Sequence, residues 1–174
     1  MKNSLFILSL FVFIGCNSAP KNKSFEKLIK LKEHTVLMFI APDCPMCKTL
    51  SQPYNELVIK YPEVQFLAVH SGKNYDAMEI NMFATETKFT PPIFRDYEYE
   101  IAHQFKATIT PEFILIDSSG KTLYQGLMDD RILQLGSYKQ TWDKMYLEDA
   151  IQAVLADKPP KVKKTDPVGC VLEY

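Results

Sequence analysis

The sequence predicts an α/β domain with a central mixed sheet flanked by helices. Two continuously apolar stretches, "TVLMFIA" at 35–41 and "EVQFLAVHS" at 63–71, are typical of strands that are covered on both faces. A helix-period pattern lies between them, so the three segments form a β-α-β unit with parallel strands. A predicted hairpin at 112–126 adds antiparallel strands, and the sheet is therefore expected to be mixed.

The helix that precedes this unit is expected to run from Ser24 to about His34. Ser24 is a suitable N-cap, and apolar residues follow at close to helical spacing, at positions 25, 28, 29 and 31.

The helix inside the β-α-β unit begins beside two cysteines. Cys44 lies where the strand turns into the helix, and Pro45 suits the first helical position because its missing N–H is not needed there. Cys47 lies one turn further along, on the same face. The apolar positions that define this helix are 50, 54, 57, 58 and 61.

The second half of the chain is expected to contain three more helices and the hairpin. Helices are predicted at 73–88 and 96–106, with at most a short strand in "FTPPIFR" between them. In the hairpin, "EFILID" turns at Gly120 and returns as "TLYQG". A closing helix is expected at 139–156, followed by a proline- and lysine-rich tail at 157–174.

Composition limits the classes of function. A chain of 174 residues with 47% hydrophobic residues can bury a core of its own as one domain, so disulfides are not required for folding. The formal charge of −1 and the lack of a basic stripe indicate no nucleic-acid partner.

The first residues, "MKNSLFILSLFVFIGC", predict export. The apolar run is too short for a membrane-spanning helix and fits a signal peptide at 1–15. The ending "FIGC" resembles the lipobox of bacterial lipoproteins, which implies lipidation of Cys16. Residues 16–23 would then form the lipid anchor and its tether, and the folded domain is expected at 24–156. We therefore expect a periplasm-facing lipoprotein of the bacterial cell envelope, held at a membrane by its lipid anchor. The alternative is a plain secretory signal that happens to contain a cysteine.

The pair Cys44 and Cys47 favours redox chemistry. A cysteine at a helix N-terminus can be held as thiolate, the nucleophilic form, and Cys47 is near enough to attack a mixed disulfide formed by Cys44. Asp43 is expected to oppose the thiolate, so an extreme oxidant is not predicted. Structural zinc would need more ligands than this pair, and a permanent disulfide across so small a loop would stabilise little.

A proline before the buried hairpin strand, in "TITPEF", invites a cis peptide bond. Together with the Cys-Pro-X-Cys pattern, the β-α-β unit, the hairpin and the closing helix, it resembles the thioredoxin fold over about residues 35–156. The resemblance implies that Pro111 is cis and faces the cysteines, and that Thr110 offers backbone hydrogen bonds to the substrate. It also implies an inserted segment, at about 73–106, between the first β-α-β unit and the C-terminal hairpin.

The chain is similar, more narrowly, to membrane-tethered redoxins of the alkyl hydroperoxide reductase/thiol-specific antioxidant group. True peroxiredoxins carry threonine three residues before the reactive cysteine, where this chain has Ala41. Antioxidant peroxidase activity is therefore the alternative, with Arg95 or Arg131 as the guanidinium that would have to approach the site. A copper-binding metallochaperone is a further alternative, although such proteins space their cysteines one residue further apart.

These resemblances imply a thiol-disulfide oxidoreductase with Cys44, Cys47, Thr110 and Pro111 as site residues and no cofactor or metal. Its expected partners are disulfide-containing proteins and an upstream thiol-disulfide reductant. Cys170 is left over once Cys16 is acylated and the other two cysteines pair. It is a candidate third redox cysteine, or else an idle cysteine of the tail.

Overall fold

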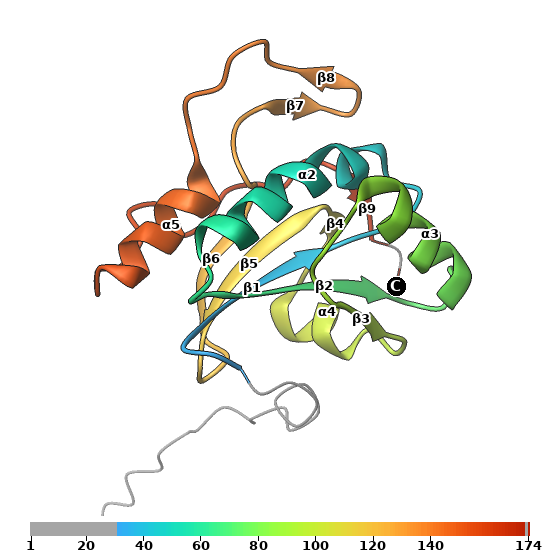
Figure 1. The fold of residues 1–174 in the computed structure, drawn as a ribbon, viewed down its shortest axis with the longest axis horizontal. Coiled ribbons are helices and arrows are strands. Elements are labelled where there is room, and N and C mark those ends of the chain that lie inside the picture. Colours follow the sequence, from blue (N-terminus) through green and yellow to red (C-terminus); the bar gives the residue numbers. More distant parts are fainter. Residues whose placement is uncertain (1–30, 173) are drawn as a thin grey trace, which may run out of the picture.

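The computed structural model describes residues 31–172 and 174, and its centre is a five-stranded sheet in the order β3-β2-β1-β5-β6 (Figure 1). β1 pairs parallel with β2 and β2 with β3, whereas β1–β5 and β5–β6 are antiparallel. The sheet is mixed, and the predicted fold class is confirmed. The strands are β1 (His34–Phe39), β2 (Gln65–Ser71), β3 (Ile93–Asp96), β5 (Glu112–Asp117) and β6 (Thr122–Gly126).

Helices cover both faces of this sheet. One face carries three helices and the opposite face carries a single short one. The three are α2 (Pro45–Lys60), α3 (Ala77–Thr87) and α5 (Tyr146–Leu155), and the short one is α4 (Glu100–Phe105). The predicted insertion is present, since α3, β3 and α4 lie between β2 and the hairpin.

The core has two layers because successive side chains of a strand point to opposite faces. In β1, Val36 and Met38 pack beneath α2 and α5, whereas Leu37 and Phe39 pack against α4. All four side chains are fully buried. This explains why the predicted strand has a continuous apolar run rather than an alternating one.

Tyr54 ties α2 to the sheet and provides a test of the packing. Its buried hydroxyl lies 3.2 Å from the carbonyl oxygen of Val36 and 2.9 Å from that of Leu67, on neighbouring strands. We expect Tyr54→Phe to lower the free energy of unfolding by about 0.5–1.5 kcal/mol, the usual net value of a buried hydrogen bond. Urea denaturation measures this. Tyr138→Phe, at a ring that is 40% exposed, is the control, and equal midpoints for both variants would contradict the assignment.

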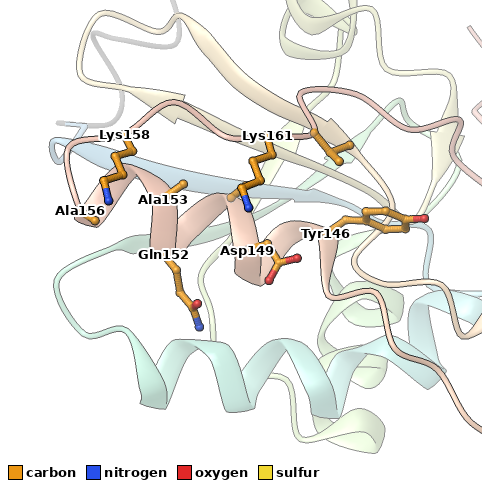
Figure 2. Close-up of a pocket in the computed structure, with 9 residues that line it drawn as sticks. Tyr146, Asp149, Gln152, Ala153, Ala156, Lys158 and Lys161 are labelled. Carbon is orange, nitrogen blue, oxygen red and sulfur yellow. The ribbon is translucent and has the colours of Figure 1, made fainter.

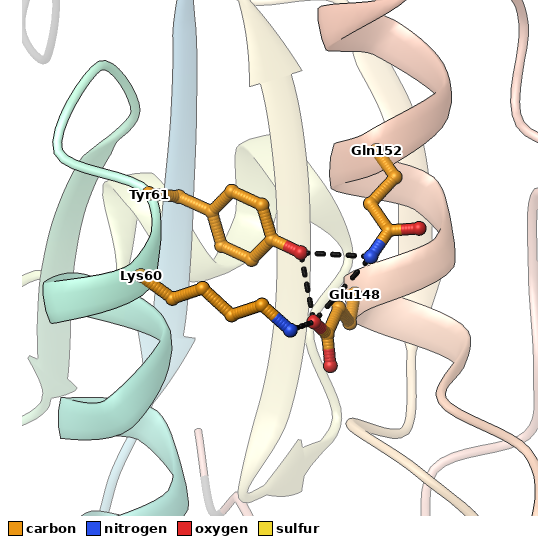
Figure 3. A network of polar contacts seen from close by, with 4 residues as sticks. All are labelled: Lys60, Tyr61, Glu148 and Gln152. Atoms are coloured by element: carbon orange, nitrogen blue, oxygen red, sulfur yellow. Dashed lines mark hydrogen bonds and ion pairs between the residues drawn. The ribbon is translucent and has the colours of Figure 1, made fainter.

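α5 docks on the end of α2 through four polar side chains (Figure 3). Tyr61 donates to Glu148 at 2.7 Å, Gln152 donates to the Tyr61 hydroxyl at 2.9 Å, and Lys60 forms an ion pair with Glu148. The contact fixes the closing helix across the sheet, on the side that α2 already covers.

The end of the predicted first helix is wrong, because residues 31–33 are not helical and β1 starts at His34. The rest of that predicted helix lies outside the described residues.

Two later helices begin further along the chain than the sequence indicated. α3 starts at Ala77 because the Asp76 carboxylate accepts the first free N–H groups in a capping box with Glu79.

The predicted helix at 96–106 is shortened to α4 because Asp96 ends β3. Its buried carboxylate accepts the N–H groups of Ile101 and Ala102 and the hydroxyl of Ser71. The residue therefore joins the strand to the helix rather than lying within the helix.

The prediction of a helix from residue 139 was wrong for its first seven positions. A small hairpin of β7 (Ile132–Gln134) and β8 (Ser137–Tyr138) precedes an extended segment that reaches α5. Trp142 fitted the helical spacing, but its side chain is 42% exposed. The guanidinium carbon of Arg131 lies over the Trp142 ring, 4.4 Å from the ring centroid.

The predicted tail lies against the sheet. Gln125 of β6 exchanges backbone hydrogen bonds with Lys163 and Thr165 of the tail. Further along the tail, β9 (Cys170–Val171) pairs with β4 (Ile109–Thr110). Nothing in the sequence pattern indicated this strand.

The predicted signal peptide, the lipidation site Cys16 and the tether lie outside the described residues. Within residues 31–172, no helix combines the length and the apolar character needed to cross a membrane.

Candidate active site

Cys44 is the N-cap of α2 and lies just beyond the end of β1. Its backbone is extended (φ −71°, ψ 116°), and Pro45 opens the helix behind it. The Cys44 side chain is only 1% exposed and that of Cys47 is fully buried. The strand-to-helix junction predicted from the sequence is therefore where the structure places the pair.

The second predicted half of the site meets the first. The Thr110–Pro111 peptide bond is cis, and the carbonyl oxygen of Thr110 lies 3.2 Å from the sulfur of Cys44. Because β5 runs antiparallel to β1, Glu112 pairs with Phe39 and the turn before it reaches the start of α2. The structure thus brings Cys44, Cys47, Thr110 and Pro111 together.

The two cysteines of the pair have opposite electrostatic environments. A hydrogen bond from the Cys47 thiol, supported by one from Cys170 and by the N–H groups of Cys47 and Met46, lowers the pKa of Cys44 to about 5 despite burial. Burial raises the pKa of Cys47 well above its ordinary value, and the hydrogen bond and charge of Cys44 add to the effect. At neutral pH, Cys44 is the thiolate and Cys47 the protonated thiol, which are the roles of attacking and resolving cysteine.

Asp43 acts on a different group from the one the sequence suggested. Its carboxylate contributes to the raised pKa of Cys170 and, second to burial, to the pKa of Tyr75, which is raised to about 12. Hydrogen bonds at the start of α2, rather than the neighbouring charge, determine the ionisation of Cys44.

The pH dependence of alkylation tests this assignment. A depressed pKa means that the thiolate is present above about pH 5 and is lost as the pH falls through that value. We expect iodoacetamide to modify reduced Cys44 with a midpoint near pH 5, and Cys47→Ala to move the midpoint upward because it removes the largest stabilising contact. Rates read from peptide mass spectra give both values. A wild-type midpoint near 8.5, as for a free thiol, would refute the assignment.

Cys170 completes a cluster of three sulfurs. Its sulfur lies 2.6 Å from that of Cys44, although the residues are 126 positions apart. Burial, followed by the hydrogen bond and charge of Cys44, raises the pKa of Cys170 to about 12. The third cysteine proposed from the sequence therefore lies directly at the reactive sulfur, as a protonated thiol.

A small polar hollow of about 210 Å³ opens beside this cluster, and its lining includes His70, which the sequence analysis did not place at the site, beside the predicted Thr110 and Cys170. His70 is 2% exposed, its Nδ1 lies 3.4 Å from the carbonyl oxygen of Ile40, and its Nε2 has no hydrogen-bond partner among the described residues. Burial lowers the pKa of His70 and keeps the ring neutral. His70 is the next-to-last residue of β2, which pairs parallel with β1, so the shared carboxyl edge of the two strands was the signal that could have located it.

A larger hollow of about 460 Å³ runs along α5 and the segment after it, away from the cysteines (Figure 2). Its lining includes Tyr146, Asp149 and Lys161, and none of the predicted site residues.

The two arginines considered for peroxide chemistry have other partners. Arg131 forms an ion pair with Asp129 at 2.7 Å, and Arg95 donates to the carbonyl oxygen of Tyr75 at 2.5 Å. Across residues 31–172, no group of three or more histidine, cysteine or carboxylate side chains could hold a metal ion.

Comparison with solved structures gives a consistent fold. An uncharacterized conserved protein from Geobacillus kaustophilus is 26% identical, with a TM-score of 0.73 over 85% of this chain and 80% of that one. A hypothetical protein from Sinorhizobium meliloti is 20% identical, with a TM-score of 0.72 over 83% and 81%. StoA from Bacillus subtilis is 19% identical, with a TM-score of 0.51 over 57% and 77%. The last two likenesses concern the fold alone.

A search of functionally curated proteins found no match. The sequence model of the thioredoxin-like domain family, in contrast, matches residues 21–136, which include both cysteines of the pair and the cis-proline. The chain belongs to the thioredoxin-like domain family.

Proposed function

We propose that this protein is a thiol-disulfide oxidoreductase of the bacterial cell envelope that works through the Cys44-Pro45-Met46-Cys47 pair. The observation that carries the proposal is the split ionisation of two adjoining sulfurs, one held as thiolate at the helix start and one buried as thiol. A structural disulfide or a solvated cysteine would need no such difference.

In the reductive direction, the Cys44 thiolate attacks one sulfur of a substrate disulfide. A Cys44–substrate bond forms, the substrate disulfide breaks, and the other substrate sulfur leaves as a thiolate. Cys47 then loses its proton to that leaving thiolate and attacks the Cys44 sulfur. The substrate leaves fully reduced, and the two electrons it gained have come from Cys44 and Cys47, which are now joined.

The low pKa of Cys44 affects both directions of this exchange. It makes Cys44 a good leaving group when a second thiol of the substrate attacks the substrate sulfur of the mixed disulfide, and it stabilises the reduced pair relative to the disulfide. Both effects favour a pair that passes its disulfide on readily, and an upstream thiol-disulfide reductant is the partner that would keep it reduced. Acylation of Cys16 would hold the domain at the membrane, facing the periplasm.

Insulin reduction by dithiothreitol tests the proposed activity. The protein should shorten the delay before the insulin B chain precipitates, in proportion to its concentration. Two parallel assays examine the alternatives. Rapid consumption of hydrogen peroxide without insulin reduction would favour the peroxidase, and stoichiometric retention of copper without it would favour the metallochaperone; either result would overturn the proposal.

A further inference from the structure

We propose that the C-terminal segment at 169–172 occupies the peptide-binding edge of the active site and that Cys170 acts there as a second resolving cysteine for Cys44. The inference rests on the proposed function, since it concerns the same reactive sulfur. It assigns to the tail both a partner, the edge of β4, and a chemical step.

Backbone pairing places the segment at the site. Thr110 pairs with Cys170 and Ile109 with Val171 in an antiparallel ladder, and the N–H of Leu172 donates to the carbonyl oxygen of Thr108 at 2.9 Å. The register sets the Cys170 side chain on the Cys44 sulfur, at 2.6 Å. The strand pairing therefore brings the backbone of Cys170 beside the site, and the side chains of Cys170 and Cys44 complete the contact.

Gly169 permits this close approach. A Cβ at this position would lie 2.1 Å from the carbonyl oxygen of Thr110 and 2.7 Å from the Ile109 side chain. No real Cβ comes so near a backbone atom, so any larger residue would push the segment off β4. The position offers a way to displace the tail without removing its cysteine.

Side chains anchor the segment on both sides of Cys170. Leu172, 9% exposed, packs into the layer beneath α4, and the ring of Tyr174 stacks on His103 with centroids 4.7 Å apart. Upstream, the hydroxyl of Thr165 accepts the N–H of Leu127 at 2.8 Å. In contrast, Val171 is 73% exposed. A segment held at both ends presents its thiol at a high effective concentration.

The same strand edge is where an extended substrate would bind. Peptides commonly add to an exposed strand through main-chain hydrogen bonds, and a peptide sulfur that reaches Cys44 must pass the backbone of Thr110. The tail uses those backbone groups. Substrate and tail therefore compete for the edge of β4. The tail leaves β4 before the substrate docks, and it returns once the substrate backbone has left β4 while its sulfur is still bonded to Cys44.

The chemical step needs no external reagent. When the tail returns to a Cys44–substrate mixed disulfide, Cys170 passes its proton to the leaving substrate sulfur and attacks Cys44. A Cys44–Cys170 disulfide forms as the Cys44–substrate bond breaks. Cys47 then attacks Cys44, the proton of Cys47 passes to the departing Cys170 sulfur, and a Cys44–Cys47 disulfide and a free Cys170 thiol remain.

The test uses the full chain with Cys47→Ser, so that Cys170 alone can resolve Cys44, and with Cys16→Ser in every sample, so that only site thiols react. Each protein is equilibrated with oxidised glutathione, and mass spectrometry measures the ratio of Cys44–Cys170 disulfide to Cys44–glutathione adduct. We expect the internal disulfide to dominate. Adding Gly169→Val should lower the ratio at least about tenfold, because a loose tail loses its effective concentration. Val162→Ala, at an exposed side chain of the tail outside this segment, should leave it unchanged.

Two results would overturn the inference. The first is that the Cys47→Ser protein carries as much glutathione on Cys44 as the same protein with Cys170→Ser added. The second is that adding Gly169→Val leaves the ratio of internal disulfide to glutathione adduct unchanged. Thermal unfolding confirms that each variant is folded. The readout is separate from the proposed activity: insulin reduction without the internal disulfide refutes only the role of the tail, whereas the internal disulfide without insulin reduction refutes only the proposed function.

Discussion

Replacing Cys44 by serine should reduce insulin reduction to the rate of dithiothreitol alone. A serine hydroxyl does not ionise near neutral pH, so the helix start would have no anion to stabilise and no nucleophile to present. Cys47 cannot take over the attack, because it is fully buried and its pKa is raised well above the ordinary value. The expected loss is the whole catalysed rate.

The control for this variant is Ile59→Ala, on the same helix at a side chain that is 80% exposed. It should keep the wild-type rate. Both variants should unfold at temperatures close to that of the wild type, which shows that the loss is chemical. A Cys44→Ser protein that retained a tenth or more of the catalysed rate would show that another sulfur attacks the substrate, and the assignment of roles would fail.

Local signals were sufficient for the centre of the fold. The two buried strands, the helix that starts at Pro45 and the hairpin around Gly120 each follow from a few consecutive residues, and all are present. The β-α-β unit and the hairpin also indicate local pairing, of β1 with β2 and of β5 with β6, and both pairs are present. The cysteine pair and the cis-proline were predictable because both lie at the ends of these well-marked strands.

The parts that failed either depend on contacts between distant residues or have no alternation of apolar residues to mark them. The pairing of Cys170 with Thr110 joins positions 60 apart, with no alternation of apolar residues to mark a strand. The hairpin of β7 and β8 contains exposed leucines, Leu133 and Leu135, whose spacing carries no information about burial.

The electrostatics of the site also depended on the folded geometry. From the sequence, the start of the helix was expected to hold the Cys44 thiolate, and Asp43, the neighbouring charge, was expected to oppose it. In the structure, the hydrogen bond from Cys47 makes the largest contribution to the pKa of Cys44, and Asp43 acts on Tyr75 and Cys170. Proximity in sequence was a poor guide because hydrogen-bond direction decides which ionisation state is favoured.

The three-sulfur arrangement changes how substrates can be trapped. With a simple pair, Cys47→Ser alone would leave the substrate bound to Cys44. Here Cys170 lies 2.6 Å from the Cys44 sulfur and can release the substrate by the same displacement. We therefore expect stable covalent complexes only with Cys47→Ser and Cys170→Ser combined, and at least about tenfold less complex with Cys47→Ser alone, because a tethered thiol outcompetes any thiol in solution.

Insulin serves as the probe, and non-reducing gels measure the insulin chain attached to each variant. With Cys16→Ser in every sample, Cys44→Ser combined with Cys170→Ser leaves only Cys47 and should trap nothing, because a fully buried thiol with a raised pKa does not attack. Equal trapping by the single Cys47→Ser and the double variant would mean that the tail does not return while substrate is attached. In that case the segment at 169–172 would block the site without taking part in the exchange, and Cys47 alone would set the lifetime of the mixed disulfide.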